Sequence, residues 1–557
     1  MKRLKGLKMM TMNKKIILSA AALLLLMASC SNDDNNVTVD GKVNVAKAIE
    51  FKVAFADYNS EQEVGVTRAS DNETNIERQT VDLGNGVLAQ CTLQRDTTMQ
   101  TSQDATRALS PLADDTYTML AYDAATHVYK GGVTGQVASG TFTPNPSQRL
   151  SLAPGIYDFV LYNSKVTRSG NTLTVSRANA LTAFMGRTTQ TITAAPHTTE
   201  YVPFTMKRIG ARVKIKLSGY MPYSGVTATL ASINATDVPG SSTYDIPTNT
   251  WTTGPGAAMS ANTTYGTSAQ EGFASSSYVI RSNEKIAFLP TTDVSKLKLT
   301  FTNGHIYRSN MANVELTFHP ASTLKLQQNG AYVLNVELMY RYLYLMSDGT
   351  TGFFNETTYG GGTKTPIAIV ISRSKRMAIA LHDAPDDYFT KSVFCANKYE
   401  MVQTCTHVND ETTSGLDETW NASYTTAAVT GDKVKGNNPD FPAFYHAAHY
   451  NPGVAYTGTP ALRWYLPTVG DYRKCLSSLC FTEGSVAYIN PMYQGITQVG
   501  GVAQSHRYYH TSSEKYGTFG GYSSNAQYVN QYEIDPTYFF QYYNKTSELG
   551  VRPFVAY

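Results

Sequence analysis

Hydrophobic and polar residues alternate with a period of two along much of the chain, in short runs bounded by turn residues. The first run places its apolar residues at every second position: Ile49, Phe51, Val53 and Phe55. Because successive side chains of a strand point to opposite faces of its sheet, this pattern predicts a half-buried strand. Further strands are expected at 116–122 and 156–162, and the run 81–93 predicts a hairpin that turns at Asn85-Gly86.

A second group of alternating runs follows residue 205. Its strands are expected at 213–217, 297–301 and 332–338, the last after an Asn329-Gly330 turn. Each group is about as long as one β-sandwich, so we expect one sandwich at 48–205 and a second at 206–339.

Composition supports an all-β class for this part of the chain. The 557 residues include 38 Tyr, and only 16% are charged. Tyrosine and the abundant threonine suit pleated, half-exposed surfaces, and long stretches with helical spacing are nearly absent.

The N-terminal segment predicts secretion and lipid attachment. Residues 1–29 hold six basic residues, all before Ile16, and no acid. A short apolar run from Ile16 to Ala28 follows, and the segment ends in Met27-Ala28-Ser29-Cys30. This is the arrangement of a secretory signal ending in a lipobox, which would make Cys30 the acylated first residue of the mature protein. A polar tether at 30–47 follows. Its acidic start is similar to the signal with which Bacteroidetes-type bacteria send lipoproteins to the outer face of the outer membrane.

Charge argues against a nucleic-acid partner. Six of the 46 Lys and Arg residues lie in the signal, which leaves 40 against 43 acids and a mature net charge of −3. Nucleic-acid binding selects a strongly basic face. No second apolar run is long enough to span a bilayer.

Cysteines and histidines offer few candidate sites. Four cysteines lie in the last third of the chain, where they allow up to two disulfides or remain buried free thiols: Cys395, Cys405, Cys475 and Cys480. The sequence contains no CxxC pair, so a zinc site is not expected. His446 and His449 are spaced as one helical turn, but without a third ligand we expect surface or packing roles.

Several motifs, taken in order, resemble the fimbrillin family of type V pilus subunits. They are the lipobox, an early alternating strand, a "TRA" tripeptide, "YTMLAYD", "PGIYDFVLYN" and "MKRIGARVKIKL". The resemblance covers roughly residues 30–340. It implies two sandwich domains, proteolytic cleavage after an Arg that follows the first strand, and assembly by strand exchange with a neighbouring pilin subunit.

Two sites match the cleavage pattern that the resemblance implies. Arg68-Ala69 directly follows the first predicted strand, and Arg107-Ala108 directly precedes the "YTMLAYD" strand, as the family pattern expects. Arg107 is the preferred candidate and Arg68 the alternative. Cleavage would free the displaced first strand and release the protein from outer-membrane lipid.

The last part of the chain, 340–557, has another texture. Its motifs "SDGT", "WYLPT", "YHTSSE" and "VRPFVAY" are similar to C-type-lectin-like domains of the Fibrobacter major paralogous type. The resemblance implies an α+β domain with a helix at about Val469 to Leu479, capped by Thr468. Asn438-Pro439-Asp440 and Trp420-Asn421 lack the order and carboxylates of a calcium lectin site, so no metal is expected.

Aromatic residues in this last domain are candidates for ligand binding. Flat rings beside amide and carboxylate groups suit sugar stacking, and the candidates are Trp420, Trp464, Tyr508 and Tyr509. The competing interpretation is that these rings belong to the core. We find no nucleophile elbow, phosphate-binding loop or carboxylate pair, so we expect neither an enzyme nor a cofactor.

Together these features predict a surface adhesin at the tip of a pilus. "VRPFVAY" is expected to be the closing strand of its own domain. A subunit that accepts a strand and has none free to donate belongs at the end of a fibre. Its ligand would be a glycan or protein of a host or bacterial surface. The alternative is an outer-membrane lipoprotein that binds such a ligand without polymerising.

Overall fold

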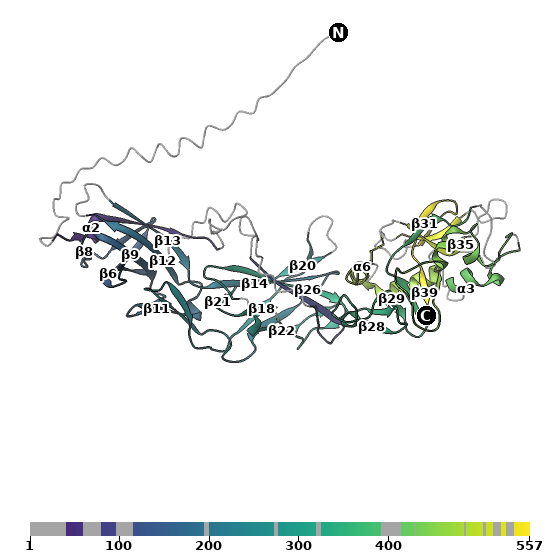
Figure 1. Ribbon diagram of the computed structural model, residues 1–557, viewed down its shortest axis with the longest axis horizontal. Helices are drawn as coiled ribbons and strands as arrows, with labels where there is room; N and C mark the ends of the chain where they lie inside the picture. The colour runs from purple at the N-terminus through teal and green to yellow at the C-terminus, as the bar shows by residue number, and fades with distance from the viewer. Residues whose placement is uncertain are drawn as a thin grey trace, which may run out of the picture. The chain divides into compact units, whose positions relative to one another are not determined.

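The computed structural model describes residues 41–58, 80–95, 115–193, 200–271, 277–318, 325–391, 414–427, 429–483, 486–504, 508–515, 525–530 and 540–557 (Figure 1). The chain forms two compact units. Unit 1 takes the described residues within Met1–Phe55, Ser110–Ser164 and Met185–Met206, and unit 2 takes those within Ala56–Leu109, Lys165–Phe184 and Lys207–Tyr557. No helix among the described residues is long and apolar enough to cross a membrane.

Unit 1 is built around a closed barrel of seven strands. In order around the barrel these are β12 (Phe184–Ile192), β13 (Glu200–Arg208), β2 (Ile49–Phe55), β7 (Thr141–Pro144), β6 (Tyr129–Ala138), β5 (Thr116–Asp123) and β9 (Gly155–Asn163). A short pair, β1 (Val43–Asn44) with β8 (Ser151–Leu152), and the single-turn helix α2 (Val45–Ala48) complete it. The sequence predicted two facing sheets here, whereas pairing on both sides of β2 closes one sheet on itself.

The first predicted strand is confirmed as β2, and it lies inside the barrel wall. It pairs in parallel with β13 over seven residues and antiparallel with β7 over two. The Phe51 ring lies 6.1 Å from the Phe142 ring, 5.9 Å from Phe159 and 6.3 Å from Phe204, measured between ring centroids. The aromatic centre of the barrel therefore forms around a strand from the start of the chain.

Unit 2 contains two larger sheets that enclose one core. The first runs β19 (Ala269–Gln270), β20 (Tyr278–Arg281), β14 (Ala211–Gly219), β26 (Ala331–Tyr340), β4 (Val87–Arg95) and β3 (Thr80–Asp82), with β21 (Ile286–Phe288) also on β14. The second runs β18 (Ser260–Thr264), β15 (Thr227–Ser232), β22 (Leu297–Asn303) and β25 (Glu315–Thr317). Their inward residues, such as Ile215, Leu230, Leu299 and Val336, form a single buried cluster.

Smaller elements flank these two sheets. They are the sheet β10 (Thr167–Ser169), β11 (Thr172–Ser176), β16 (Ser241–Asp245) and β17 (Thr250–Thr253), the hairpin β23 (His305–Ile306) and β24 (Ser309–Asn310), and the 3-10 helices η2 (Arg177–Asn179) and η3 (Val294–Lys296).

The predicted hairpin at 81–93 exists, but it pairs in unit 2 and outside the expected 48–205 domain. Strands β3 and β4 turn through Gly84 and Gly86, whose φ angles are +81° and +87°. β4 then pairs with β26 over nine residues. Strand β11 likewise pairs with β16 of unit 2. The two units are therefore interleaved along the chain. The sequence did not predict this, because an alternating pattern indicates which face of a strand is buried but not which strand pairs with it.

The C-terminal part of unit 2 is mixed α and β. One sheet runs β28 (Thr351–Phe353), β27 (Leu343–Met346), β29 (Pro366–Ser372), β30 (Met377–Ala380), β39 (Phe554–Ala556) and β32 (Arg463–Tyr465). Another runs β31 (Ala384–Tyr388), β38 (Glu548–Val551), β35 (Tyr508–Lys515), β36 (Asn525–Asn530) and β37 (Phe540–Asn544), and β33 (Phe481–Glu483) pairs with β34 (Val486–Tyr488).

Its helices are α3 (Gly415–Trp420), α4 (Pro442–Ala448), α5 (Val469–Leu479) and α6 (Asn490–Thr497), with 3-10 helices η4 (Phe354–Glu356), η6 (Ala422–Tyr424) and η7 (Lys435–Asn437). The predicted helix at 469–479 is confirmed as α5. The Thr468 hydroxyl accepts a 3.0 Å hydrogen bond from the Asp471 backbone N–H, and the Asp471 carboxylate accepts from the Thr468 N–H. This reciprocal cap satisfies backbone donors that a helix start leaves open.

An aromatic cluster joins the sandwich of unit 2 to its C-terminal part. The Tyr340 ring lies 4.9 Å from Tyr342 and 5.1 Å from Phe481, and Phe481 lies 5.4 Å from Tyr307. Phe481 is a member of the sandwich core, and Met339 is a member of the C-terminal core. The expected boundary at residue 339 therefore falls within continuous packing.

Candidate functional site

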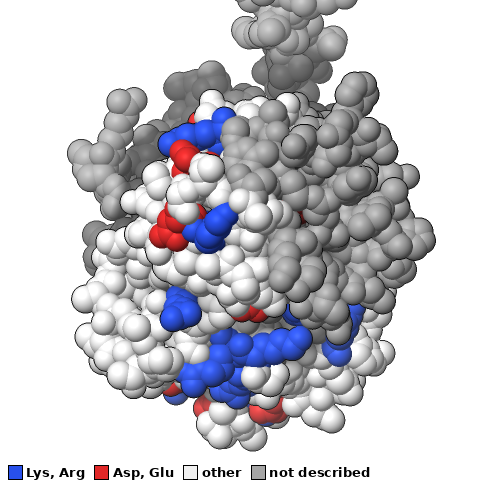
Figure 2. Space-filling view, turned by 90° about the vertical axis from the view of Figure 1, so that its right-hand side faces the viewer, with Lys and Arg blue, Asp and Glu red and all other residues white. Residues whose placement is uncertain are grey.

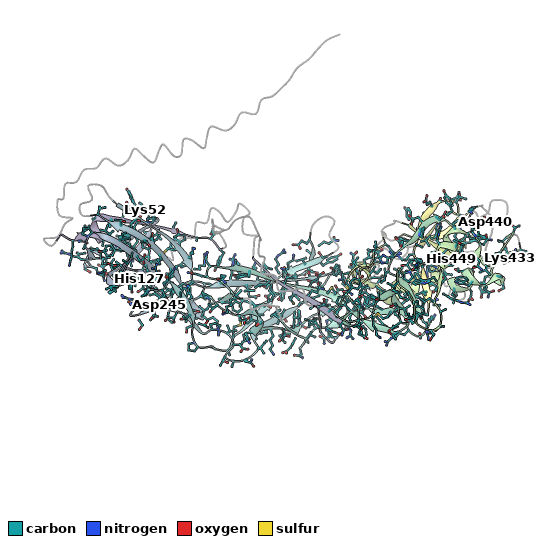
Figure 3. All side chains as sticks on the ribbon, in the orientation of Figure 1. Lys52, His127, Asp245, Lys433, Asp440 and His449 are labelled. Carbon is teal, nitrogen blue, oxygen red and sulfur yellow. The ribbon has the colours of Figure 1, made fainter. Side chains whose placement is uncertain are left out.

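The strand β2 is the first candidate site, and its side chains alternate as predicted. Ile49 and Val53 are each 6% exposed and Phe51 is fully buried, whereas Phe55, at the end of the strand, is only half-buried. Lys52 lies on the outer face of the barrel, with its ammonium 5.5 Å from the centre of the Tyr201 ring (Figure 3). The strand thus fills the barrel with three side chains and presents polar ones outside.

One edge of β2 is held weakly. Its pairing with β7 covers only Phe51 with Phe142 and Lys52 with Thr141, supplemented by a 2.7 Å hydrogen bond from the Val53 N–H to the Gly140 carbonyl. The opposite edge pairs with β13 along the whole strand. Opening the barrel at the β2–β7 seam therefore breaks fewer backbone hydrogen bonds than opening it at β13.

A second N-terminal strand, β4, is buried in the core of unit 2. Its inward side chains are Val87, Ala89, Cys91 and Leu93. Burial raises the pKa of the Cys91 thiol to about 12, so the thiol stays protonated and unreactive. This strand is the second half of the predicted hairpin at 81–93, for which no functional role was expected.

Several predicted site residues lie outside the described residues. They are Cys30, Arg68, Ala69, Arg107, Ala108, Cys395 and Cys405. Their roles in lipidation, maturation and disulfide formation stay predictions.

Two of the four aromatic candidates for sugar stacking are core residues, which corrects the prediction. Trp464 is 5% exposed and packs edge-on against Tyr450 at 4.6 Å between ring centroids. Tyr509 is fully buried, and its hydroxyl donates a 2.8 Å hydrogen bond to Asp383. A ring enclosed by protein on both faces has no surface left for a sugar.

The other two aromatic candidates keep partial exposure. Trp420, at the end of α3, donates from its indole nitrogen to the Trp464 carbonyl at 2.7 Å and packs on the C-terminal core. Tyr508 begins β35 and is half-buried. The indole N–H of Trp420 is therefore already hydrogen-bonded within the protein, and only part of the ring surface is accessible to a ligand.

The cysteines that the structure describes are free thiols. Cys475 and Cys480 are buried and unpaired, which favours the free-thiol alternative for these two residues. Burial raises the pKa of both thiols above the ordinary value.

The two histidines at the end of α4, His446 and its C-cap residue His449, make different contacts. His446 lies 3.1 Å from an Asp387 carboxylate oxygen, whereas the His449 ring stacks on Tyr445 at 4.2 Å between centroids (Figure 3). No group of three metal-ligating side chains occurs among the described residues. His446 is half-buried and His449 is exposed, so each makes a contact of the surface or packing kind that was expected.

Lysine ammonium groups organise the loop that holds the Asn438-Pro439-Asp440 motif. The Lys433 ammonium donates to the carbonyls of Thr426 at 3.0 Å, Ala427 at 3.1 Å and Val429. The fully buried Lys435 pairs with Glu418 at 3.2 Å. Carbonyl and carboxylate oxygens are the ligands that Ca²⁺ takes, and in this loop they bind lysine.

We therefore expect that removing divalent metal ions with a chelator leaves the thermal unfolding midpoint unchanged. Lys433→Met should lower the free energy of unfolding by about 1–3 kcal/mol, because three backbone carbonyls then lose the hydrogen bond from the ammonium. Differential scanning calorimetry with and without EDTA, on both proteins, measures the two effects. A midpoint of the unsubstituted protein that drops with EDTA and recovers with Ca²⁺ would contradict the expectation.

A buried histidine gives the C-terminal part a defined pH dependence. His510 donates from Nε2 to the Asp387 carbonyl at 3.0 Å, and burial lowers its pKa from 6.5 to about 4. The unfolded chain then binds more protons than the folded chain between pH 6.5 and 4, so stability is full above pH 6.5 and falls as the pH drops. We expect the free energy of unfolding to fall by about 3 kcal/mol between pH 6.5 and pH 4. In the His510→Gln protein this pH dependence should largely disappear, which urea titrations at a series of pH values measure.

Basic residues gather in part of one end face (Figure 2). The turn between β29 and β30 also carries three exposed cationic side chains, whose place in that view is not labelled: Arg373, Lys375 and Arg376. The Arg376 guanidinium lies 5.3 Å from the centre of the Tyr557 ring.

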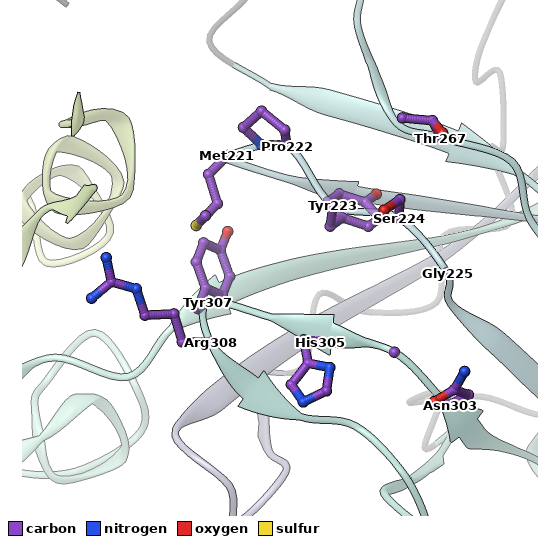
Figure 4. A pocket seen from close by; sticks show the side chains of 11 residues that line it. Met221, Pro222, Tyr223, Ser224, Gly225, Thr267, Asn303, His305, Tyr307 and Arg308 are labelled. Carbon is purple, nitrogen blue, oxygen red and sulfur yellow. The ribbon is translucent and has the colours of Figure 1, made fainter. Parts of the chain in front are cut away.

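The described residues also form a pocket that sequence analysis missed. It has a volume of about 630 Å³ and lies at one end of the sandwich of unit 2 (Figure 4). Its walls come from three separate segments around Tyr223, Thr267 and Tyr307. No local motif marks residues that only the fold brings together.

Comparison with known proteins assigns no family. No family model matches the chain, and no curated protein matches it. Among solved structures, a fimbrial protein from Bacteroides vulgatus is 15% identical, with a TM-score of 0.28, over 44% of this chain and 93% of its own. A "putative cell adhesion protein" from Bacteroides uniformis is 13% identical, with a TM-score of 0.26, over 44% of this chain and 92% of its own. Likeness at these values assigns neither a family nor an activity.

Proposed function

We propose that this chain is a cell-surface adhesin that enters a fimbria by protease-triggered strand exchange and takes the tip position. The observation that carries the proposal is the place of β2. This strand completes a barrel, follows only β1 and α2 among the described elements, and is separated by 24 residues, 56–79, from the next strand that the structure describes. A single cut in that connection, at Arg68, or beyond β4, at Arg107, would leave β2 held in the barrel only by non-covalent contacts.

The contacts of β2 define what an exchanged strand must supply. Its three buried side chains contribute roughly 1.5–3 kcal/mol each, about 5–9 kcal/mol together before the entropy of ordering the strand. Departure of β2 would expose the rings of Phe142, Phe159 and Phe204. An incoming strand with apolar residues at alternate positions would cover those rings and restore the backbone pairing.

The two candidate cleavage sites have different consequences. A cut at Arg68 frees β2 alone, because β3 begins at Thr80. A cut at Arg107 frees β2 together with β3 and β4, and β4 leaves nine paired residues of β26 exposed in unit 2. We keep Arg107 as the preferred site because it directly precedes β5, as the fimbrillin pattern expects.

The tip position is supported by the pairing of β39. This strand lies between β30 and β32 and pairs with both. Phe554 and Val555 are fully buried on opposite faces of the sheet. Donating β39 to a neighbour would disrupt two strand pairs and two cores, so the chain is better suited to accept a strand than to give one.

The remaining parts of the proposal concern location and partners. Acylation of Cys30 would anchor the chain in the outer membrane before cleavage, and cleavage would release it into the fimbria. The partners are a neighbouring pilin and a glycan or protein of a host or bacterial surface. The role is binding, without catalysis.

N-terminal sequencing of protein recovered from surface fibres tests the proposal. We expect the recovered protein to start at Ala108. Polymerised subunits should give a ladder of high-molecular-mass species on a denaturing gel, and we expect Arg107→Ala to abolish this ladder and Arg68→Ala to leave it intact. A start at Ala69 would move the cut to Arg68 and keep strand exchange. An acylated Cys30 without any ladder would replace the proposal with the non-polymerised lipoprotein.

A further inference from the structure

The chain that leaves β2 enters unit 2 and is held there at residues 56–58. The Arg208 guanidinium donates a 3.4 Å hydrogen bond to the carbonyl of the buried Ala56. The Asn329 side chain donates from its amide nitrogen to the Asp57 carbonyl at 2.8 Å, and its oxygen accepts from the Arg208 backbone N–H at 3.2 Å. Two consecutive carbonyls therefore have partners in unit 2 directly after the barrel strand ends.

The ring of Tyr58, the last residue of this segment, lies against two arginine side chains. The guanidinium carbon of Arg208 is 4.3 Å from the centre of the ring and that of Arg212 is 4.2 Å from it, both within cation–π range. Both arginines are enclosed, with 7% of Arg208 and 6% of Arg212 exposed. Burial raises the pKa of Tyr58 and the two guanidinium groups oppose this rise, so the ring meets the cations as a neutral phenol.

Arg212 lies on the outer face of β14, where the next residues of the same face remain in contact with water. Arg212, Lys214 and Lys216 alternate along the strand with residues of the sandwich core. Lys214 and Lys216 are half-buried, whereas Arg212 is buried under a cover that includes the Tyr58 ring. A planar guanidinium stacks on an aromatic face and is more weakly hydrated than an ammonium, so arginine suits a position beneath a ring.

Enclosing two arginines beside each other has an electrostatic cost that the segment after β2 reduces. Burial lowers the pKa of Arg208, and the charge of Arg212 lowers it as well. Tyr58 and Asp57 act in the opposite direction, and both belong to the segment after β2. A strand that enclosed these guanidinium groups without a ring would leave like charges buried together with less compensation.

Both candidate cleavage sites lie beyond Tyr58, so the segment released by either cut carries Tyr58 away together with β2. Tyr58 follows Val53, the last buried side chain of β2, by five positions. A neighbour's strand that pairs with β13 in the direction and register of β2 places the fifth residue after that anchor beside Arg208 and Arg212. Alternating apolar residues are enough to fill the barrel, whereas the cover of the two arginines depends on this one side chain.

We propose that Arg208 and Arg212 select the strand of the neighbouring pilin, which must carry an aromatic side chain five positions after its last buried anchor. The inference rests on the strand exchange proposed above and names the chemistry of the strand that is accepted. The incoming ring takes the cation–π contacts of Tyr58, and the backbone before it takes the hydrogen bonds of Ala56 and Asp57. A strand with lysine or arginine at this position is rejected, because a third cation would meet the two guanidinium groups.

Peptide binding to the mature chain, cut at Arg68 or Arg107 and still holding its N-terminal fragment, tests this selection. A fluorescent peptide of residues 43–58 is titrated into the cut chain, and the bound fraction is measured after size-exclusion chromatography. We expect the Tyr58→Ala peptide to bind about tenfold more weakly because it lacks the ring, and the Tyr58→Phe peptide to bind almost as well as the unsubstituted one. The Lys52→Ala peptide, changed at an exposed side chain, is the control and should bind unchanged.

Variants of the accepting chain test the same contact from the other side. In the Arg212→Gln protein the preference for tyrosine over alanine at position 58 of the peptide should fall to about threefold or less, because one of the two cations is gone. Lys214→Gln removes a charge two positions along the same face of β14 and should leave the preference unchanged. Thermal unfolding of both variants establishes that they are folded.

The results separate this inference from the proposed function on which it rests. If no peptide binds, or if the Phe51→Ala peptide binds as tightly as the unsubstituted one, the barrel does not exchange β2 and both proposals fail. If the Phe51→Ala peptide binds weakly and the Tyr58→Ala peptide binds fully, strand exchange stands and the selection by the arginines is wrong. An undiminished preference for tyrosine in a folded Arg212→Gln protein would also overturn the selection.

Discussion

Replacing Phe51 with alanine is expected to lower the free energy of unfolding of unit 1 by about 3–5 kcal/mol. The Phe51 side chain is fully buried, and its ring contacts three other phenylalanine rings from β7, β9 and β13. A closed barrel cannot collapse around the lost ring without shifting strands that pair on both sides. The truncation therefore leaves most of the ring volume as a cavity.

Denaturant titration of the uncleaved chain measures this loss, and β2 provides its own control. Lys52→Ala removes an exposed side chain from the next position, where surface substitutions usually change stability by less than about 0.5 kcal/mol. Equal losses for the two variants would mean that β2 does not hold the barrel closed, and the strand-exchange proposal would lose its structural basis.

The same substitution has a consequence after cleavage. Once the chain is cut at Arg107 or at Arg68, Phe51→Ala should speed the departure of the released segment that carries β2, because the fully buried Phe51 ring contributes a large share of the buried surface of this strand. A faster release seen by size-exclusion chromatography of cleaved protein would tie stability to assembly.

Local features of this fold were predictable from the sequence, and pairing partners were not. The alternation at 49–55, the Asn85-Gly86 hairpin and the helix that Thr468 caps all follow from contacts within a few residues. That β4 pairs with β26 depends on residues about 240 positions apart, as in Cys91 opposite Val336. Period-two patterns carry no information on such distant neighbours, so the two units could not be separated from sequence order.

The candidate sites divide along the same line. Composition identified the aromatic residues of the C-terminal part, but only the sheet register shows that Trp464 faces a buried cluster with Val555. The pocket of unit 2 brings together the segment 221–225, Thr267 and the segment 303–308, which are distant in the sequence. The turn between β23 and β24 has no sequence signature, since Tyr307 and Arg308 both adopt positive φ angles, where turn chemistry favours Asn and Gly.

Replacing Lys545 with methionine is expected to cost unit 2 about 3–5 kcal/mol of stability. Lys545 and Glu514 form an ion pair in which both side chains are fully buried, and the Lys545 ammonium also lies 5.6 Å from the centre of the Phe389 ring. Methionine has a similar length but no charge, so the Glu514 carboxylate would remain buried without its cation. The carboxylate must then take up a proton or draw in water, and each costs free energy.

Urea unfolding at neutral pH measures the cost, with Lys391→Met as the control. Lys391 and Asp440 form an exposed pair at 3.6 Å, for which about 0–1 kcal/mol is expected. Adding Glu514→Gln to Lys545→Met should restore much of the loss, because the buried charge is then removed with its partner. A double variant as unstable as Lys545→Met would show that packing of the lysine stem, rather than the unpaired carboxylate, sets the stability of this core.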